Sequence, residues 1–317
     1  ETSKHRKNVA GVHLRLAWAG SASEVASDSA ALTLVDEIDR PDPNSTGEGS
    51  LEEIAEARGD AYADSKTGYT STPTEGRTSR EPHPKTGQLH WKVSDEKKIF
   101  SPVWRLWQNG TRHEWVVPHL DKDCGEYFSP SSDLLWWPGK GTDDECTPAE
   151  ASKQAKLVCP HCGGQIDDSE RQAMNAKGTL IAPGQTVNAK TGEVEGVSDT
   201  EDNDAFSYWV SGLCSFSAKK SYGFLAKKLL EAINSGDPGK LMAVYNTGFG
   251  EIYSMVGDAP AWEEVYELRH NYQSGQVPEG FDDLICTVDV QKNRVYYLIR
   301  AWRAGMSSRL IEWGEIW

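Results

Sequence analysis

The chain has 317 residues, of which 38% are hydrophobic and 26% are charged. This composition allows packed cores in two or three domains and argues against wholesale disorder. No apolar run approaches the roughly 20 residues that cross a bilayer, and no apolar signal segment follows the N-terminus. A formal net charge of −15 argues against a general nucleic-acid coat, although a local basic groove remains compatible with it.

The cysteine and tryptophan counts further narrow the class of protein to which this chain can belong. The chain has six Cys and no signal peptide, and a tight Cys-Pro-His-Cys run favours metal binding over disulfides. Twelve Trp indicate well-packed aromatic seams or stacking surfaces. The chain begins in what reads as a sheet and ends on a strand-like run, Leu310–Trp317, so we expect a fragment of a longer protein.

Residues 11–40 predict a strand, a short helix or loop, and a second strand. Apolar and other residues alternate over Val12–Trp18, the period of a strand with one buried face. A short β-prone run, Leu32–Val35, then ends directly in Asp36-Glu37. Strand, crossover and strand together predict a parallel sheet buried on both faces.

The next three stretches differ in character. Ser50 and Glu53 have capping-box spacing and predict a helix that runs to about Ala61. Residues 76–180 show little helical periodicity, many turn formers and four of the six Cys, which indicates a small loop-rich module. Residues 181–204 are polar, Gly-rich and acidic, which predicts an exposed loop or linker.

The last third is first helical and then extended. From Ala205 to Arg269 the pattern is predicted to be helical, most clearly over Ser221–Ile233, with an end near Gly236. Leu284–Trp317 predicts a three-stranded meander with its first turn at Lys292-Asn293. No internal repeat is visible.

Asp36 and Glu37 end an apolar strand, which is how P-loop nucleotidases present the Walker B motif. There the aspartate holds Mg²⁺ and the next carboxylate polarises the attacking water. The same pair could simply begin a solvated loop. Ser71-Thr72-Pro73-Thr74 favours the nucleotidase interpretation, because helicase-like motors often carry a small hydroxyl motif on the neighbouring strand; the plain alternative is a Ser/Thr-Pro turn.

No G-x-x-x-x-G-K-[ST] motif occurs in the 317 residues. Without those backbone amides and that lysine, the phosphates of ATP have no cradle. We therefore expect any P-loop to lie upstream of Glu1, and we expect this chain alone not to hydrolyse ATP.

Cys159-Pro160-His161-Cys162 followed by two glycines predicts a zinc knuckle, since two thiolates at this spacing hold one tetrahedral ion. A second pair of ligands is required. We favour His119 and Cys124, which follow a strand-like run and precede a glycine, while Cys146 and, less strongly, His161 remain alternatives. A structural rather than catalytic zinc is expected.

Asp289 interrupts an apolar strand, which is costly unless the carboxylate is paired, metal-bound or solvent-facing. An Asp in the first strand of a three-stranded meander also opens the RNase H-like nuclease fold, where it is the first ligand of a two-metal site. The outer face of a half-exposed sheet is the alternative position.

Together these motifs resemble the large terminase subunit of tailed phages, the GpA family. The segments that carry the resemblance run in family order: Leu32–Arg40, Ser71–Thr74, Val117-Pro118, Cys159–Cys162, Asn246–Glu251 and Thr287–Arg294. The resemblance implies an ATP-driven motor that packages viral DNA, followed by a nuclease that cuts concatemers into genome lengths.

The resemblance also implies roles, cofactors and partners. Asp36 would bind Mg²⁺ and Glu37 would activate water, while Asp289 would be the first Mg²⁺ ligand of the nuclease. Ser71, Thr72 and Thr74 are the residues that would couple nucleotide state to DNA movement. ATP and Mg²⁺ act in the complete protein, and its partners are double-stranded viral DNA, the terminase small subunit, the portal and further copies of itself. The expected location is the host cytoplasm, without a membrane.

Three departures from the family pattern qualify what the resemblance implies. The P-loop is missing, and the first knuckle reads His-x₄-Cys where the family usually has Cys-Pro-x-Cys. Few residues follow Asp289, so the other nuclease carboxylates are expected beyond Trp317. Neither active site is therefore expected to be complete.

The expected fold class is α/β. It comprises the C-terminal part of a P-loop ATPase sheet (1–80), a zinc-binding loop-rich insert (81–180), a linker and helical connector (181–278), and the first three strands of an RNase H-like nuclease (279–317). A zinc-ribbon module that binds nucleic acid or protein without catalysis is the alternative. It requires tryptophans exposed beside basic residues, namely Trp91, Trp104, Trp107 and Trp115. A nuclease without a motor is a third interpretation.

Overall fold

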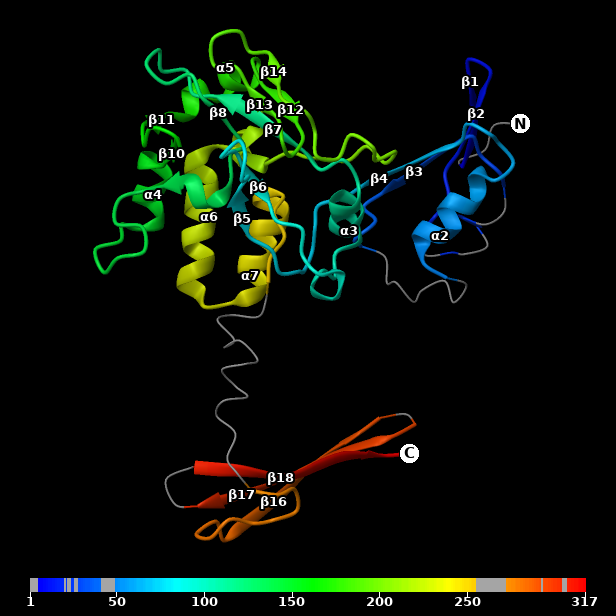
Figure 1. Cartoon of the computed structure of the whole chain (residues 1–317), viewed down its shortest axis with the longest axis vertical. Coiled ribbons are helices and arrows are strands. Elements are labelled where there is room, and N and C mark those ends of the chain that lie inside the picture. Colours follow the sequence, from blue (N-terminus) through cyan, green and yellow to red (C-terminus); the bar gives the residue numbers. More distant parts are fainter. Residues whose placement is uncertain are drawn as a thin grey trace. The chain divides into compact units, whose positions relative to one another are not determined.

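The computed structural model describes residues 5–19, 21, 24–25, 28–40, 49–254, 272–291, 293–303 and 307–317 (Figure 1). The chain divides into two compact units, Glu1–Met255 and Val256–Trp317. Secondary structure is mixed α/β and is distributed over several small sheets. Among the described residues, no helix combines the length and apolar character needed to cross a membrane.

An antiparallel hairpin of β1 (Arg6–Val9) and β2 (Val12–Arg15) opens the first unit. The predicted half-buried strand over Val12–Trp18 is wrong, because β2 ends early and its side chains are exposed, including Leu14. Alternation identifies which side chains share a face, but it does not supply a second layer to cover that face.

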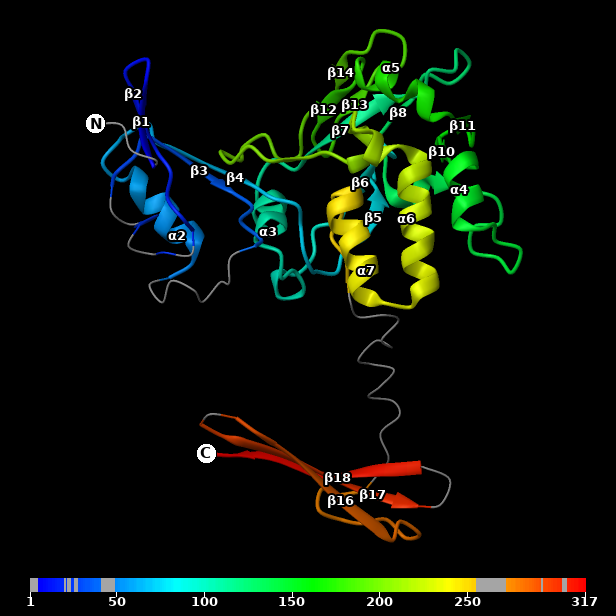
Figure 2. The same cartoon turned by 180° about the vertical axis from the view of Figure 1, so that it is seen from behind.

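A strand–helix–strand unit follows the hairpin (Figure 2). Strand β3 (Leu32–Asp36) pairs in parallel with β4 (Lys66–Thr70), and helix α2 (Leu51–Glu56) lies in the crossover. The register runs from Leu32 opposite Lys66 to Asp36 opposite Thr70. Leu32–Asp36 thus lies in a parallel pair, but its partner is β4 and not the predicted strand before it. The predicted burial on both faces is also wrong, because Leu32 and Leu34 are exposed.

Helix α2 begins where the capping box predicted. The Ser50 hydroxyl accepts from the Glu53 backbone N–H at 3.2 Å, and the Glu53 carboxylate accepts from the Ser50 N–H at 2.9 Å. The helix ends at Glu56 and tightens into a 3₁₀ turn, Ala57–Gly59, so the predicted end near Ala61 was too late. Ala55 packs with apolar side chains of the strand layer in a small core.

The cysteine-bearing region consists of short elements joined by turns, as its composition predicted. Its helices are α3 (Pro102–Asn109), α4 (Pro148–Gln154) and α5 (Arg171–Asn175). Its strands are β5 (Arg80–Pro82), β6 (Leu89–Trp91), β7 (His113–Pro118), β8 (Tyr127–Phe128), β9 (Leu135–Trp136), β10 (Lys156–Val158), β11 (Gln165–Ile166) and β12 (Thr179–Ile181).

Three small sheets organise these strands. Strands β5 and β6 form an antiparallel hairpin, and β9, β10 and β11 form a sheet in the order β11-β10-β9. Strand β7 lies between β12 and β15 (Tyr208–Trp209) and also pairs with β8. The two hairpins β7–β8 and β10–β11 each end in a turn, and these turns carry the candidate metal ligands.

Residues 181–204 are more structured than predicted. A two-stranded hairpin forms from β13 (Thr186–Val187) and β14 (Val194–Glu195). Ile181 and Val187 are buried with Val116 of β7 in a core cluster. The polar composition of this stretch reflects its turns, while its few apolar residues anchor it to the β7 sheet.

Helix α6 (Tyr222–Ser235) confirms the clearest helical prediction. Ser221 caps its start, and Gly236 ends it in the left-handed conformation with φ of 63°. Helix α7 (Pro238–Ala243) follows and continues as a π-helical segment, Val244–Phe249. The stretch before α6 was predicted helical but contains β15 and two 3₁₀ turns instead.

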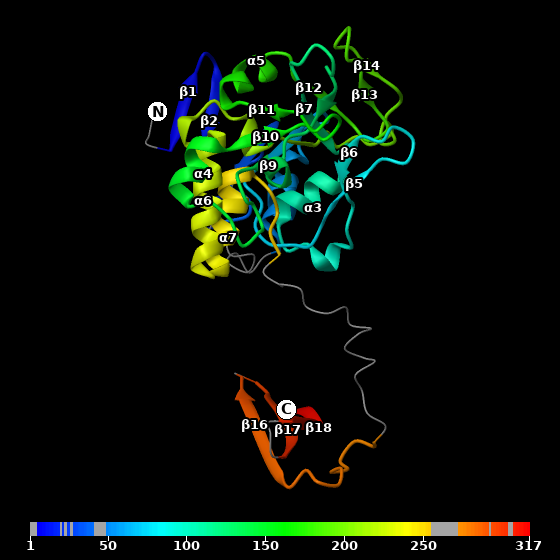
Figure 3. The same ribbon diagram turned by 90° about the vertical axis from the view of Figure 1, so that its left-hand side faces the viewer.

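The main core lies where α4 and α6 pack on the β9–β11 sheet (Figure 3). A second core is built from tryptophans. Trp91, Trp104, Trp107 and Trp209 are buried together, with the Trp91 ring centroid 5.3 Å from Trp104 and 5.5 Å from Trp209 in edge-to-face geometry. This burial is contrary to the exposed tryptophans that the binding-module interpretation requires.

The second unit is the predicted meander. Strands β16 (Asp283–Val290), β17 (Val295–Arg303) and β18 (Ser307–Ile316) pair antiparallel in chain order, with an irregularity at Ile299/Arg300. A small core contains Phe281 and other apolar side chains of this unit. Lys292 in the first predicted turn, residues 304–306 and the part of the helical prediction over 255–269 lie outside the described residues.

Candidate functional site

Two hairpin turns bring four metal-ligand side chains together in the first unit. The β7–β8 turn supplies His119 and Cys124, and the β10–β11 turn supplies Cys159 and Cys162. Their ligand atoms all lie within 4.8 Å of one another. These are the two pairs favoured from the sequence, although Cys124 and Cys159 are far apart along the chain.

The spacing within this cluster fits one tetrahedral ion. The Cys124 and Cys159 sulfurs are 3.9 Å apart, and the Cys162 sulfur lies 3.3 Å from His119 Nδ1. A tetrahedron with metal–sulfur bonds of about 2.3 Å has edges of roughly 3.8 Å. Three thiol sulfurs and one imidazole nitrogen are donors that a zinc-type ion accepts, so the residues present fit such a group.

The thiols of this cluster differ in environment. Burial raises the pKa of Cys159 to about 12, and it also raises the pKa of Cys124. The pKa of Cys162 is lowered, chiefly because the Gly164 N–H points at its sulfur from 3.4 Å. A bound cation would favour thiolates at all three positions, so metal binding would release protons.

Two alternative ligands considered from the sequence lie outside the cluster. His161 Nε2 is 3.1 Å from the Tyr127 carbonyl oxygen, so its ring is directed to the β8 backbone. Cys146 packs against the main core and does not belong to the four-residue group.

The Walker B-like pair lies at the carboxyl end of the parallel strands. Asp36 is the last residue of β3 and pairs in register with Thr70 at the end of β4. Glu37 follows with φ of 56°, a left-handed conformation that non-glycine residues rarely adopt. Both side chains are exposed, so the edge where ligands gather in open α/β sheets presents two carboxylates.

The segment after β4 contacts the turn after β3. The Ser71 hydroxyl accepts from the Asp39 N–H at 3.3 Å, and Thr74 Oγ1 donates to the Asp39 carboxylate at 2.9 Å. Thr72 Oγ1 is hydrogen-bonded by Arg40. The structure thus brings the three predicted coupling residues beside the Asp36-Glu37 turn.

Asp39 and Arg40 were not identified as site residues from the sequence. Both belong to the Leu32–Arg40 segment that carried the resemblance. A charged pair one residue after two candidate catalytic carboxylates is the signal that could have identified them.

Glu251 is a second residue whose role the sequence did not reveal. It ends the Asn246–Glu251 segment and is 3% exposed. Its carboxylate accepts from the Ser132 N–H at 2.7 Å and from the Ser132 hydroxyl at 2.5 Å. Burial raises the pKa of Glu251 to about 7 despite these donors.

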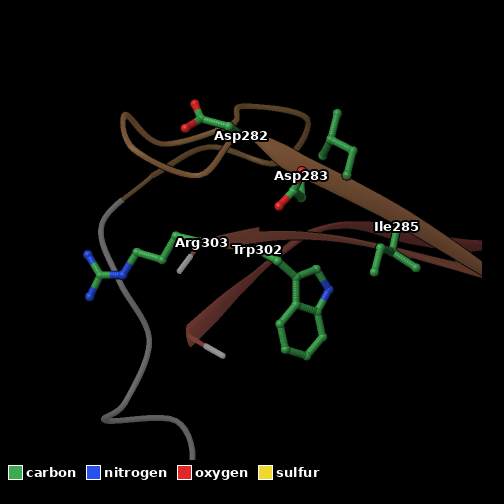
Figure 4. A pocket seen from close by; sticks show the side chains of 6 residues that line it. Asp282, Asp283, Ile285, Trp302 and Arg303 are labelled. Carbon is green, nitrogen blue, oxygen red and sulfur yellow. The ribbon is translucent and has the colours of Figure 1, made fainter. Parts of the chain in front are cut away.

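Asp289 lies in β16 of the second unit and is exposed, the solvent-facing alternative. Gln291 Nε2 donates to its carboxylate at 2.7 Å, and its cross-strand partner is Tyr296. A hollow of about 530 Å³ opens elsewhere on this unit, between the start of β16 and the end of β17 (Figure 4). Its lining includes Asp282 and Asp283 but not Asp289.

Comparison with known families assigns both halves of the chain. Residues 1–179 match the family described as "Phage terminase large subunit gpA, ATPase domain", and residues 205–317 match "Terminase large subunit gpA, endonuclease domain". No curated protein and no solved structure matches the chain. The ATPase match alone covers more than half of the residues. The chain therefore belongs to the gpA family of phage terminase large subunits.

Proposed function

We propose that this chain is part of the machine that translocates viral DNA with ATP and cuts concatemeric DNA into genome lengths. The observation that carries this proposal is the succession of an ATPase-family match and an endonuclease-family match along one chain. The position of two carboxylates at the end of a parallel strand pair supports the same conclusion.

We place the nucleotide-handling residues of the ATPase part in residues 1–80, within the ATPase-family match of residues 1–179. Asp36 would hold the Mg²⁺ that accompanies ATP, and Glu37 would orient and polarise the attacking water. Ser71, Thr72 and Thr74 are the coupling residues of the proposal, because their hydroxyl groups bond to the turn that carries Glu37. The 317 residues contain no Walker A motif, so we expect no ATP turnover by the chain alone.

Residues 279–317 form the proposed start of an RNase H-like nuclease. Asp289 would be the first ligand of its Mg²⁺ site, and further carboxylates are needed for cutting. We expect no DNA cutting by the chain alone. Turnover of ATP or DNA above that of a Glu37→Ala, Asp289→Ala control would contradict this expectation.

The insert of residues 81–180 is proposed to hold a structural zinc ion. The fit of a Cys₃His donor set with edges of 3.3 and 3.9 Å supports zinc, which would join the two hairpin turns and supply no chemistry to the reaction. Mass spectrometry of the purified protein should find one zinc per chain. His119→Ala and Cys124→Ala should lose it, and Cys146→Ala should keep it.

The remaining parts of the proposal concern partners and place. Residues 181–278, most of which lie within the endonuclease-family match of residues 205–317, would connect the motor to the nuclease strands. Double-stranded viral DNA, the small subunit, the portal and other copies of the chain are the proposed partners, and the host cytoplasm is the proposed location.

A chimera tests the function directly. The chain would replace the matching region of a packaging-competent gpA-family terminase, and DNA packaging and cutting would be measured separately. We expect Glu37→Gln to abolish packaging with DNA cutting retained, and Asp289→Asn to abolish cutting with ATP hydrolysis retained. A chimera that retains zinc and packages DNA regardless of both substitutions would contradict the proposal.

A further inference from the structure

The β1–β2 hairpin is basic although the chain as a whole is acidic (Figure 1). Between Glu1 and Glu24 the sequence has four Lys or Arg residues, two His and no Asp or Glu, whereas the formal net charge of the chain is −15. The side chains of both strands are exposed or half-buried. The hairpin therefore presents local positive charge to solvent.

Two arginines of the hairpin lie directly opposite each other. Arg6 of β1 pairs in register with Arg15 of β2, so the two side chains share one face of the ribbon. Like charges directly opposite each other destabilise an antiparallel pair. This arrangement therefore calls for an anion that both guanidinium groups can contact.

A carboxylate of the same chain occupies that position. Asp28, in the segment before β3, has its Oδ2 atom 3.2 Å from Arg6 Nη2 and 2.6 Å from Arg15 Nη1. Guanidinium groups bind phosphate oxygens through the same N–H donors that they offer to a carboxylate. The Arg6–Arg15 pair is therefore a site for one oxyanion, and Asp28 fills it in this structure.

This carboxylate is held weakly enough to be displaced. The exposed fractions of the side chains are 64% for Arg6, 27% for Arg15 and 51% for Asp28. Exposed ion pairs contribute about 1 kcal/mol or less each, because water screens them. A DNA backbone presents many phosphates, and the release of its condensed counterions favours their contact with arginine. Asp28 would therefore compete with DNA for the two arginines without excluding it.

The shape of the hairpin suits duplex DNA. The turn residues Ala10 and Gly11 have φ of 50° and 84°, the positive values of a tight two-residue hairpin turn. A two-stranded β-ribbon is narrow enough to enter the major groove. Phosphate contacts carry no sequence information directly, which suits a protein that moves along DNA of any sequence.

We propose that the Arg6–Arg15 pair binds a phosphate of the duplex DNA backbone, and that Asp28 occupies the pair when DNA is absent. The inference rests on the proposed function, because it assigns a contact to the DNA on which that function acts. The contact requires neither nucleotide nor metal, so the purified full chain is sufficient to test it.

Binding of a fluorescently labelled duplex, measured by anisotropy at several salt concentrations, tests the inference. Arg6→Gln with Arg15→Gln should weaken binding roughly three- to tenfold at low salt. The slope of log Kd against log salt should fall by about one, because one phosphate contact contributes about 0.9 to it. A fall of about two would mean that the arginines contact separate phosphates, which contradicts a shared site.

Asp28→Asn should have the opposite effect. It should raise the affinity for the duplex roughly two- to tenfold, the range that loss of two exposed ion pairs can return. In a chain that also carries Arg6→Gln and Arg15→Gln, Asp28→Asn should give no gain beyond that of a charge control. This dependence separates displacement of Asp28 from a general change in net charge.

Matched charge controls come from exposed residues elsewhere on the first unit. Asp143→Asn removes one negative charge, and Arg77→Gln with Lys122→Gln removes two positive charges. Both controls should leave the affinity for the duplex near that of the parent chain. Circular dichroism and zinc content would establish that each variant is folded.

Three results would overturn the inference: no duplex binding by the Asp28→Asn chain, equal losses in the arginine pair and its control, or a gain from Asp28→Asn that persists without the two arginines. Tripolyphosphate distinguishes a nucleotide as the source of the phosphate. If Asp28→Asn raises the affinity for tripolyphosphate but not for the duplex, the DNA contact is refuted. The chimera tests the proposed function at Glu37 and Asp289, so either conclusion can fail while the other stands.

Discussion

Glu251 shows how one buried carboxyl group can make folding depend on pH. Burial raises its pKa to about 7, whereas an unfolded Glu titrates near its ordinary value of 4.5. Between these values the folded state binds more protons than the unfolded state. The contribution of Glu251 to the free energy of unfolding is therefore complete below pH 4.5, the pKa of the unfolded state. It is lost as the pH rises through about 7, the pKa of the folded state.

We expect the free energy of unfolding to fall between pH 5 and pH 8, by up to about 1.4 kcal/mol per pH unit from this group. Glu251→Gln should flatten this slope, since the amide has no charge to bury. Urea unfolding at several pH values measures the effect, with Glu193→Gln as the exposed control. A slope that Glu251→Gln leaves unchanged would refute the assignment.

Gly164 is a residue whose lack of a side chain the metal cluster requires. An added Cβ would lie 2.8 Å from His119 Cε1 and 3.2 Å from the Cys162 sulfur, so two ligands would have to move. We expect Gly164→Ala to weaken metal binding roughly 10- to 100-fold, as changes beside metal ligands do. Competition with a chromophoric chelator measures this affinity.

The neighbouring glycine provides the matched control. Gly163 has φ of 73°, and its Cβ would meet nothing within 4 Å. Gly163→Ala should therefore cost stability through backbone strain but keep its metal affinity. Equal losses of metal affinity in the two variants would show that the affinity depends on the conformation of the turn and not on the contact between residue 164 and the ligands.

At the scale of elements, a buried ion pair joins the β5–β6 hairpin to β7. Glu114 is fully buried in β7 and lies 3.3 Å from Arg80 Nη2 and 3.3 Å from His90 Nδ1. Its burial alone would raise its pKa, but the hydrogen bond to His90 and the charge of Arg80 hold that pKa below the ordinary value. Arg80 also donates to the Ser129 carbonyl at 2.9 Å.

Arg80→Ala should destabilise the first unit by about 3–5 kcal/mol, because it removes the arginine charge from a buried carboxylate and leaves Glu114 with His90 and the Trp91 N–H as neighbours. Adding Glu114→Gln should recover part of this loss. Arg77→Ala, at an exposed arginine, should change the free energy of unfolding by less than about 0.5 kcal/mol. Chemical unfolding compares the three, and a small effect of Arg80→Ala would mean that water reaches Glu114.

Elements with strong local signals were predictable from the sequence. The capping box of Ser50 and Glu53 fixed the start of α2, and apolar spacing fixed α6. The two pairs of candidate metal ligands could also be predicted from the sequence, because each pair belongs to one hairpin turn. The exposure of β2 was not readable, since alternation says nothing about which layer covers a face.

Contacts between distant segments were beyond the sequence. Asp39 meets Ser101, and Ser132 meets Glu251, only because the packed core places their elements together. No local pattern encodes these distances. The Asn246–Glu251 segment supported the resemblance, yet the burial of its last carboxylate depends on a loop more than a hundred residues away.

For the whole molecule, the two compact units have separate cores. The main core of the first unit includes Cys159, one of the four candidate metal ligands, and the second unit is built around Phe281, Ala301 and Ile311. Metal binding contributes directly to the stability of the fold that forms its site. Removing the proposed zinc ion should therefore affect one unit and spare the other.

Hydrogen-exchange mass spectrometry with and without a chelator tests this separation. We expect chelation to reduce amide protection in β7, β8, β10 and β11, and in helix α6 that packs on the same core, because the two hairpin turns lose their link. Protection in β16, β17 and β18 should not change. Cys159→Ser with Cys162→Ser should reproduce the loss without chelator, which separates metal removal from any direct effect of the reagent. An equal loss of protection in the β16–β18 sheet would mean that the two units unfold as one.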